Sequence, residues 1–385
     1  MRFEFSTAGR IIFGPGVAEQ APDLVAGCGR HAFLILGGTP DRFRRLLDPL
    51  AARGIACESL QVPGEPTTDM AQEAVTLARR AQTQVVLAIG GGSVLDVGKV
   101  VAAMLTNGGA LTDYLEVVGK GRPLQNLPAP CLAVPTTAGT GAEVTYNAVL
   151  GVPDQQVKVS IRSAMMVPQW AIVDPLLTHS MPPELTASTG LDALTQLIEA
   201  FVSNKANPLT DGLCREGLPR AGRSLRRAFE DGRDAGARED MSLASLFSGM
   251  ALANAKLGAV HGFAGPLGGM TEAPHGVICG KLLPYVMQAN VQALQDRAPG
   301  SPSLSRFDEI GRILTGRGKA GAAEAVAWIE DLCAVLGLPG LRRYGLSEND
   351  FPAVAAKARN ASSMKGNPIE LNDDELVAIL RQAID

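Results

Sequence analysis

The sequence predicts an α/β N-terminal domain with a Rossmann-like, mostly parallel sheet, followed by an all-α C-terminal domain. In the first half, short apolar runs alternate with segments of helical spacing, which is typical of a doubly wound sheet. Beyond Asp174-Pro175 this alternation gives way to helical patterns alone. The length of 385 residues suits two or three domains of about 150 residues. We expect one domain over residues 1–178 and the other over residues 179–385.

Apolar runs and helical spacing give the individual elements of the first half. The predicted strands are residues 31–36, 55–62, 85–89, 131–134 and 171–173. The predicted helices are residues 41–53, 68–81 and 94–105. Phe3 with Phe5, and Ile11 to Phe13, indicate an extra pair of strands at a sheet edge. The predicted helices of the second half are residues 185–203, 208–229, 235–256, 276–288, 305–314, 320–336 and 373–383.

Composition argues against several classes of partner. Lys plus Arg number 35 and Asp plus Glu number 39, so the formal net charge is −4. The chain therefore has no excess of positive charge that would favour binding to nucleic acid or to an anionic membrane. No apolar run approaches the ~18 residues of a membrane span, and the first residues lack a secretory apolar region. The six cysteines form no CxxC pair, which predicts free thiols and disfavours a cysteine-based zinc site. We expect a cytoplasmic protein with no nucleic-acid or membrane partner.

The loop Gly90-Gly91-Gly92-Ser93 joins a predicted strand to a predicted helix. Its glycines let the backbone approach a phosphate, and the helix N-terminus favours an anion. Ser93 can cap that helix and donate its hydroxyl. Asp96 would repel a phosphate, so we expect it to accept a hydrogen bond from a ribose or from a loop amide. The loop is neither GxGxxG nor a Walker A motif, and a tight turn without a ligand is the alternative.

A second polar loop, PTTAGTGAEVT at residues 135–145, follows the next strand and contains two glycines and four threonines. At the carboxyl end of a parallel strand, such a loop lines the crevice where ligands bind. The alternative is a turn in which the threonines satisfy their own backbone. Because two such loops follow successive strands of the predicted sheet, we predict a nucleotide site.

Polar residues of the second half are candidate ligands for a divalent cation. Asp192 and Gln196 share one helix face and Glu199 lies near it, while His261 and His275 follow fourteen residues apart. A carboxylate, an amide and two imidazoles can surround a cation. This spacing is no recognised zinc motif, and separated histidines more often cap helices or make structural hydrogen bonds. The pattern alone therefore leaves the metal open.

Together these segments resemble the iron-containing (group III) alcohol dehydrogenase family. The motifs, in order, are GGGS with Asp96 and Lys99, PTTAGTGAEVT, GLDALTQLIEA, HGFAGPLGG and APHG, and the resemblance runs nearly end to end. It implies the architecture shared with dehydroquinate synthase, with a catalytic cleft between two domains, and a homodimer. It also implies NAD(P)-linked interconversion of small alcohols with aldehydes or ketones.

The resemblance also implies which residues hold the cofactor. The pyrophosphate and adjoining ribose would contact Gly91, Gly92, Ser93 and Asp96. The phosphate, the nicotinamide and its ribose would contact Thr136, Thr137, Thr140, Asn147 and Lys158. The turn with Gly37 and Thr39 is a third contact. Many relatives have Asp where Gly37 stands, and Arg42 lies close behind, which slightly favours NADP over NAD.

Two positions depart from the family pattern. The family's metal ligands are one Asp and three His, of which Asp192, His261 and His275 match three; these are the candidate catalytic residues. Gln196 occupies the fourth position, so a divalent metal, Fe²⁺ or Zn²⁺, should bind more loosely and harder ions should be favoured. Gly265 replaces a proton-relay histidine, so proton transfer would run through a cofactor ribose hydroxyl and water.

Three alternatives stay open at this point. A maleylacetate-reductase-like oxidoreductase would need more basic residues facing a dicarboxylate. A dehydroquinate-synthase-like lyase would need several Lys or Arg near the metal, whereas residues 250–290 contain only Lys256 and Lys281. A catalytically weakened nucleotide-binding protein is the third alternative, because two family histidines are missing.

Overall fold

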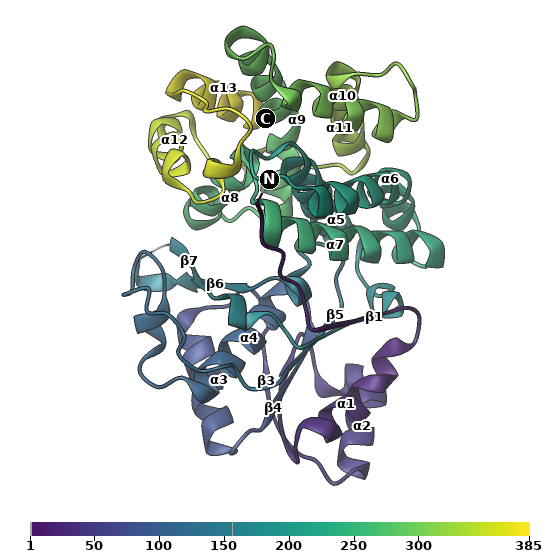
Figure 1. Cartoon of the computed structure of the whole chain (residues 1–385), viewed down its shortest axis with the longest axis vertical. Helices are drawn as coiled ribbons and strands as arrows, with labels where there is room; N and C mark the ends of the chain where they lie inside the picture. The colour runs from purple at the N-terminus through teal and green to yellow at the C-terminus, as the bar shows by residue number, and fades with distance from the viewer. Residues whose placement is uncertain (1, 156) are drawn as a thin grey trace. The chain divides into compact units, whose positions relative to one another are not determined.

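A six-stranded parallel sheet organises the first unit of the chain (Figure 1). The computed structural model describes residues 2–155 and 157–385; Met1 and Gln156 lie outside the described residues. The sheet order is β1-β8-β5-β4-β2-β3. Its strands are β1 (Arg10–Phe13), β2 (His31–Leu36), β3 (Ala56–Gln61), β4 (Val85–Gly90), β5 (Cys131–Pro135) and β8 (Trp170–Val173). The predicted α/β class with a mostly parallel sheet is confirmed.

Helices cover both faces of this sheet, which explains why its central strands are continuous apolar runs. Phe33 and Ile35 of β2 pack in one core with residues of α3 (Thr68–Arg80) and α4 (Gly92–Thr106). The alternate residues Leu34 and Leu36 pack in a second core with α1 (Ala21–Cys28) and α2 (Arg44–Ala52). Figure 1 shows these two helix pairs on opposite sides of the sheet. Because the side chains of β2 point alternately to the two faces of the sheet, this one strand packs against both helix layers.

The strand order reverses around β2. From β2 the chain goes to β3 at the sheet edge and then returns to β4 on the other side of β2. Ligands of open α/β sheets bind beyond the carboxyl ends of the strands at such a reversal. The glycine-rich turns that begin at Gly37 and Gly91 follow the two strands concerned. The topology therefore places both predicted cofactor turns at the favoured position.

Two features of this unit differ from the expectation. β1 pairs with β8, but Phe3 and Phe5 lie outside any strand, so the predicted N-terminal pair is a single edge strand. A separate antiparallel hairpin, β6 (Asn147–Val152) with β7 (Val157–Arg162), was not predicted. Its signal was the alternation of apolar and polar residues in VKVSIR, which is typical of a half-buried strand.

The second unit is helical, as predicted. This unit comprises Ser180–Asp385, together with Ala138–Thr140 and the segment that ends at Phe5. The first unit comprises Ser6–Thr137 and Gly141–His179. The helices are α5 (Pro183–Val202), α6 (Pro208–Glu230), α7 (Ala235–Ala255), α8 (Ala259–Met270), α9 (His275–Arg297), α10 (Pro302–Thr315), α11 (Ala322–Val335), α12 (Phe351–Asn360) and α13 (Asp373–Ala383).

The central helix of this unit is α5. From Leu191 to Val202 every residue is buried, and α5 contacts α6, α7 and α9. Burial of a polar side chain costs free energy unless that side chain is hydrogen-bonded, so most buried polar groups have partners. The buried polar residues Asp192, Gln196 and Glu199 on α5 therefore mark the part of the unit where polar groups must converge.

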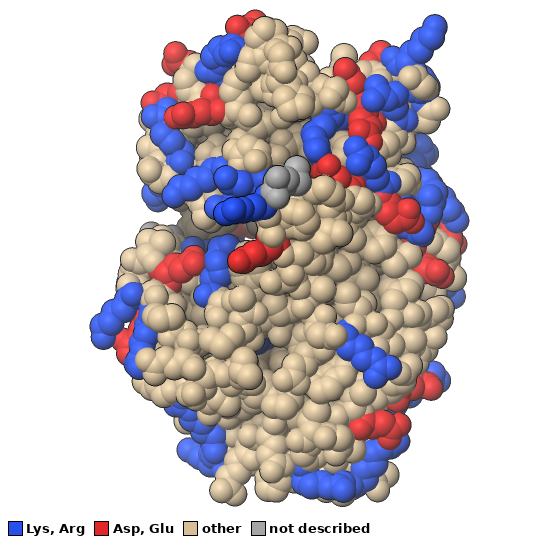
Figure 2. All heavy atoms as spheres, in the orientation of Figure 1, with Lys and Arg blue, Asp and Glu red and all other residues tan. Residues whose placement is uncertain are grey.

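Charged side chains of both signs lie on the surface of the helical unit. On the face in view in Figure 2, basic and acidic side chains are interspersed over the helical unit. Several arginines there pair with carboxylates, such as Arg306 with Asp211 and Arg215 with Glu309. Among the described residues no single helix could cross a membrane; α7 and α8 meet that length and composition test only together, and they are bent by 99°.

Candidate active site

Three helices of the second unit bring the predicted catalytic residues together. Asp192 lies in the middle of α5, His261 in the first turn of α8, and His275 is the first residue of α9. Nε2 of His261 lies 3.2 Å from Oδ1 of Asp192, and Nε2 of His275 lies 3.6 Å from the same oxygen. The two imidazole ring centroids are 5.4 Å apart. Residues separated by up to 83 positions (275 − 192) thus converge on one carboxylate oxygen.

A fourth side chain, Cys279, belongs to the same group. Its Sγ lies 3.8 Å from Asp192 Oδ1 and 3.8 Å from His261 Nε2. One ligand atom from each of Asp192, His261, His275 and Cys279 lies within 4.8 Å of the others. These four residues are called the Asp192 cluster below. Sequence reasoning missed Cys279; the available signal was its position four residues after His275, on the same face of one helix.

Gln196 lies beside the cluster with both ends of its amide engaged. Its Nε2 donates to Asp192 Oδ1 at 3.1 Å, and its Oε1 accepts from the Ser248 hydroxyl at 2.9 Å. An ionised carboxylate only accepts hydrogen bonds, so the amide must present its nitrogen to Asp192. The structure therefore shows Gln196 as a hydrogen-bond partner of Asp192.

Glu199 fixes the orientation of His261. Its Oε2 lies 2.6 Å from Nδ1 of His261, and its Oε1 accepts from the backbone N–H of Val260 at 2.7 Å. Because the carboxylate accepts, the Nδ1 position carries the proton and Nε2 is directed to Asp192 and Cys279. Buried carboxylates that orient metal-binding histidines make this contact. Glu199 is therefore a positioning residue.

Two further positions complete the surroundings of Asp192. The Thr140 hydroxyl donates to Oδ2 of Asp192 at 3.0 Å, so this predicted cofactor residue contacts the cluster. Gly265, where the family has a histidine, is exposed, and a Cβ built there would meet no described atom within 4 Å. The space beside Gly265 is therefore open.

The cluster stabilises separated charges although it is buried. Burial opposes ionisation of Asp192, yet His275, His261 and the Thr140 hydroxyl hold the pKa of its carboxyl at about 2. Burial also opposes the charging of both imidazoles, but Cys279 and Asp192 raise the pKa of His261 and of His275 above the ordinary value. Burial raises the pKa of the Cys279 thiol, but the two imidazoles lower it by more. The pKa of this thiol is therefore lower than its ordinary value. Positive charge inside this group is therefore favoured.

The donor set fits a divalent cation. A carboxylate oxygen and two imidazole nitrogens suit Zn²⁺ and Fe²⁺. The orientation of His261 by Glu199 leaves Nε2 as the ligating atom, as metal sites require. Binding of a cation would displace the imidazole protons, which is the usual coupling between metal binding and proton release.

The predicted cofactor turns of the first unit touch one another. A Cβ on Gly37 would lie 3.0 Å from Cα of Gly90, and a Cβ on Gly91 would lie 3.3 Å from Oγ1 of Thr137. The Gly37 N–H donates to the carbonyl of Ile89 at 2.9 Å. A side chain at either position would be tight, so glycine leaves the backbone here accessible to a ligand. The arrangement fits a dinucleotide pyrophosphate above the N-terminus of α4.

Asp96 and Lys99 of α4 hold the neighbouring loop and hairpin. Oδ2 of Asp96 accepts from the backbone N–H of Val149 at 2.8 Å, and Oδ1 pairs with Lys99 Nζ at 2.8 Å. Burial raises the pKa of Asp96 although Lys99 lowers it. Lys99 is fully buried and also donates to the carbonyls of Ala142 and Asn147. The amide that Asp96 accepts from belongs to strand β6 and not to the glycine-rich loop, so the expected bond to a loop amide is wrong.

The other predicted cofactor residues lie in the first unit. Ser93 is in the first turn of α4, Thr136 is buried at the end of β5, and Thr39 is exposed before α2. Asn147 begins β6, and Lys158 of β7 pairs with Glu65 at 3.2 Å. The guanidinium of Arg42 lies 5.4 Å from the Phe43 ring centroid. Whether these residues contact the cofactor stays a prediction.

Glu143, which follows Ala142 in the threonine-rich loop, couples stability to pH. It is 2% exposed, and burial raises the pKa of its carboxyl to about 7 although its backbone hydrogen bond and Lys99 oppose this. The folded state favours the protonated form of Glu143. This preference stabilises the fold fully when the pH is below the ordinary pKa of a glutamate, and the stabilisation is lost as the pH rises through the folded-state pKa of about 7. We expect Glu143→Gln to gain roughly 2 kcal/mol in unfolding free energy relative to wild type between pH 5 and pH 8.

Urea unfolding at the two pH values measures this difference. The matched control is Glu73→Gln, because Glu73 is an exposed residue of α3. Its pH dependence should parallel that of wild type. A Glu143→Gln curve that also runs parallel to wild type would contradict the assignment.

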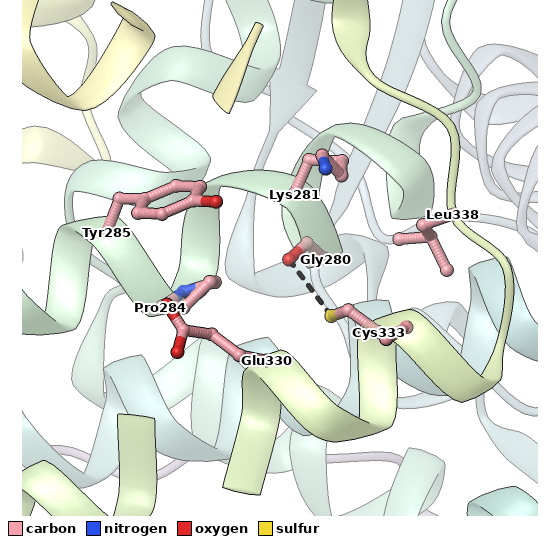
Figure 3. Close-up of a pocket in the computed structure, with 8 residues that line it drawn as sticks. Gly280, Lys281, Pro284, Tyr285, Glu330, Cys333 and Leu338 are labelled. Atoms are coloured by element: carbon pink, nitrogen blue, oxygen red, sulfur yellow. Dashed lines mark hydrogen bonds between the residues drawn. The ribbon is translucent and has the colours of Figure 1, made fainter. Parts of the chain in front are cut away.

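A separate pocket of about 220 Å³ lies beside α9 and α11 (Figure 3). Lys281, Tyr285, Glu330 and Cys333 are among its lining residues, which include no member of the Asp192 cluster. Burial raises the pKa of Cys333 to about 12 and also raises that of Tyr285. The Cys333 thiol donates to the carbonyl of Gly280 at 3.4 Å. Burial therefore keeps the Cys333 thiol and the Tyr285 phenol protonated at neutral pH.

Comparisons with known proteins show the family of the chain. A family model for iron-containing alcohol dehydrogenase matches residues 8–175, and the model for the C-terminal region of the Fe-containing alcohol dehydrogenase family matches residues 186–384. The 1,3-propanediol dehydrogenase of Klebsiella pneumoniae is 39% identical over 324 residues, which cover 84% of this chain and 81% of that protein.

Solved structures show the same fold. A crystal structure of 1,3-propanediol oxidoreductase has a TM-score of 0.90 and 34% identity, with 100% of both chains covered. Sulfoacetaldehyde reductase from Bifidobacterium kashiwanohense, solved in complex with NAD⁺, has a TM-score of 0.87 and 29% identity, with 100% of this chain and 99% of that chain covered. Family models that match both units, with relatives of this similarity, place the chain in the iron-containing alcohol dehydrogenase family.

Proposed function

We propose that this chain is an NAD(P)-dependent alcohol dehydrogenase or aldehyde reductase whose substrate oxygen binds at the Asp192 cluster. The family performs alcohol and aldehyde oxidoreduction. The observation that carries the assignment of the site is the convergence of Asp192, His261 and His275 on one buried oxygen. Convergence of these residues from three helices is what a cation-binding site requires.

The chemistry requires stabilisation of negative charge on the substrate oxygen while hydride moves between carbon and nicotinamide. A divalent cation, Fe²⁺ or Zn²⁺, held by Asp192, His261 and His275 would supply this stabilisation as a Lewis acid. Glu199 holds His261 in the ligating tautomer, and Thr140 and Gln196 hold the Asp192 carboxylate. Because Gly265 offers no imidazole, we expect the substrate proton to travel through water and a cofactor ribose hydroxyl.

The cofactor binds in this proposal at the reversal of the parallel sheet. The backbone of Gly91 and Gly92 and the Ser93 hydroxyl hold the pyrophosphate at the N-terminus of α4. Gly37 leaves no carboxylate to repel a ribose 2′-phosphate, and Arg42 supplies positive charge nearby, which favours NADPH. The homodimer and the cytoplasmic location stay predictions.

Steady-state assays with a panel of small aldehydes, each with NADH and with NADPH, test the function. We expect turnover with at least one aldehyde and a higher kcat/KM with NADPH. A large preference for NADH would contradict the cofactor choice alone. Protein that carries metal and binds nucleotide, yet turns over no aldehyde or alcohol with either cofactor, would overturn the proposal in favour of a nucleotide-binding protein.

A further inference from the structure

We propose that Cys279 is the fourth protein ligand of the metal, together with Asp192, His261 and His275, and that Gln196 does not ligate. This inference rests on the metal site of the proposed function and changes its composition. It replaces the expectation that an amide oxygen completes the site. Within the described residues, the thiol of Cys279 contacts Asp192 and His261 of this cluster.

Four of the six separations between the ligand atoms are close to those around a four-coordinate ion, to which a substrate oxygen would add a fifth ligand. A tetrahedral ion with bonds of about 2.0–2.3 Å separates its nitrogen, oxygen and sulfur ligands by roughly 3.3–3.6 Å. The histidine nitrogens lie 3.2 and 3.6 Å from Asp192 Oδ1. The Cys279 sulfur lies 3.8 Å from that oxygen and 3.8 Å from His261 Nε2. Each separation is within a few tenths of an ångström of the required value, with the longer ones at the larger sulfur atom.

The partners of Gln196 argue against ligation by its amide. To place Oε1 on a cation beside Asp192, the amide would have to turn over. That rotation would break the 3.1 Å bond to Asp192, and the Ser248 hydroxyl, which now donates to Gln196 at 2.9 Å, would have to accept instead. Through its hydrogen bond to Oδ1, Gln196 positions the Asp192 carboxylate.

A thiolate changes the preference among metals. Sulfur ligands favour Zn²⁺, and oxygen-rich sites favour Mn²⁺ and Mg²⁺. If both imidazoles are neutral, one carboxylate and one thiolate would together neutralise the charge of a divalent ion. One aspartate with three histidines would leave a net positive charge. We therefore expect strong selection of Zn²⁺ over Mn²⁺, whereas an amide oxygen in place of the thiolate would make this selection weaker.

Cobalt substitution tests the ligand directly. Full-length protein freed of metal by a chelator is reloaded with Co²⁺, and its absorption spectrum is recorded. Wild type should show a thiolate-to-cobalt charge-transfer band in the near ultraviolet. This readout needs no variant and no turnover. Absence of the band in wild-type protein that binds one Co²⁺ per chain would overturn the proposal.

Variants then separate ligation from positioning. Cys279→Ser should lose the band and weaken Zn²⁺ binding by more than ~100-fold, beyond the ~10–100-fold typical of hydrogen-bond partners of ligands. Gln196→Ala should retain the band and weaken Zn²⁺ binding by about tenfold. Cys333→Ser is the matched control, because Cys333 lies outside the cluster, and it should change neither property. A band that survives in Cys279→Ser would also overturn the proposal.

The outcomes distinguish this inference from the proposed function. A charge-transfer band in a protein that reduces no aldehyde would support Cys279 as ligand while overturning the activity. Turnover by a protein without the band would support the activity and overturn the ligand assignment.

Discussion

Asp192→Asn should lower kcat/KM by at least about 10³-fold, since loss of the ion-binding charge removes several kcal/mol of transition-state stabilisation. The substitution preserves the shape of the side chain but removes the negative charge around which His261, His275 and Cys279 are arranged. Metal content per chain should fall in the same variant. Steady-state kinetics and elemental analysis of the purified protein measure the two effects.

Asp240→Asn is the matched control for that experiment. Asp240 is another buried aspartate of the helical unit, and it pairs with Arg220 and Arg223 away from the Asp192 cluster. Its substitution should alter stability but leave kcat/KM and metal content unchanged. If Asp192→Asn kept kcat/KM within tenfold of wild type, the assignment of Asp192 to the reaction would be wrong.

The second large effect is expected for Gly276→Ala, at the start of α9. A Cβ at this position would lie 1.9 Å from the backbone carbonyl oxygen of Ser188 in α5, so one of the two helices must move. Overpacking of this kind costs about 1–3 kcal/mol or more, which outweighs the helix propensity of about 1 kcal/mol that alanine gains over glycine. Since His275 is the preceding residue, we also expect weaker metal binding.

Thermal and urea unfolding measure the loss of stability, and metal titration measures the effect on His275. Gly212→Ala is the matched control, because Gly212 lies within α6 and a Cβ there would meet no described atom within 4 Å. That variant should be as stable as wild type or more so. Unchanged stability in Gly276→Ala would show that α5 and α9 are less tightly packed than the structure indicates.

The sequence predicted those parts of the fold that depend on local pattern. β4 is a continuous apolar run followed by glycines, and both its extent and the helix after it were confirmed. The helices α5 and α13 likewise agree with their predicted ranges to within two residues at each end. In these segments periodicity, turn residues and burial all indicate the same element.

Features that depend on packing between distant segments were not predicted. α8 contains Gly262, Gly265 and Pro266, which disfavour a helix locally, and its contacts with α9 and α12 stabilise it. Lys99 pairs with Asp96 and bonds to the loop that follows β5, a partner set that sequence spacing does not reveal. Cys279 was treated as one free thiol among six, because only the fold places it beside residues of α5 and α8.

The assignment of Ala138–Thr140 to the helical unit has a practical consequence for dissecting the protein. The polypeptide passes between the two units at four places, near residues 5, 137, 140 and 179. No single truncation therefore yields an intact half, and an expressed fragment of residues 6–179 would carry Thr140 without Asp192, the acceptor of its hydroxyl. Attempts to crystallise or titrate the first unit alone should begin from a redesigned connection at residues 138–140 rather than from a simple deletion.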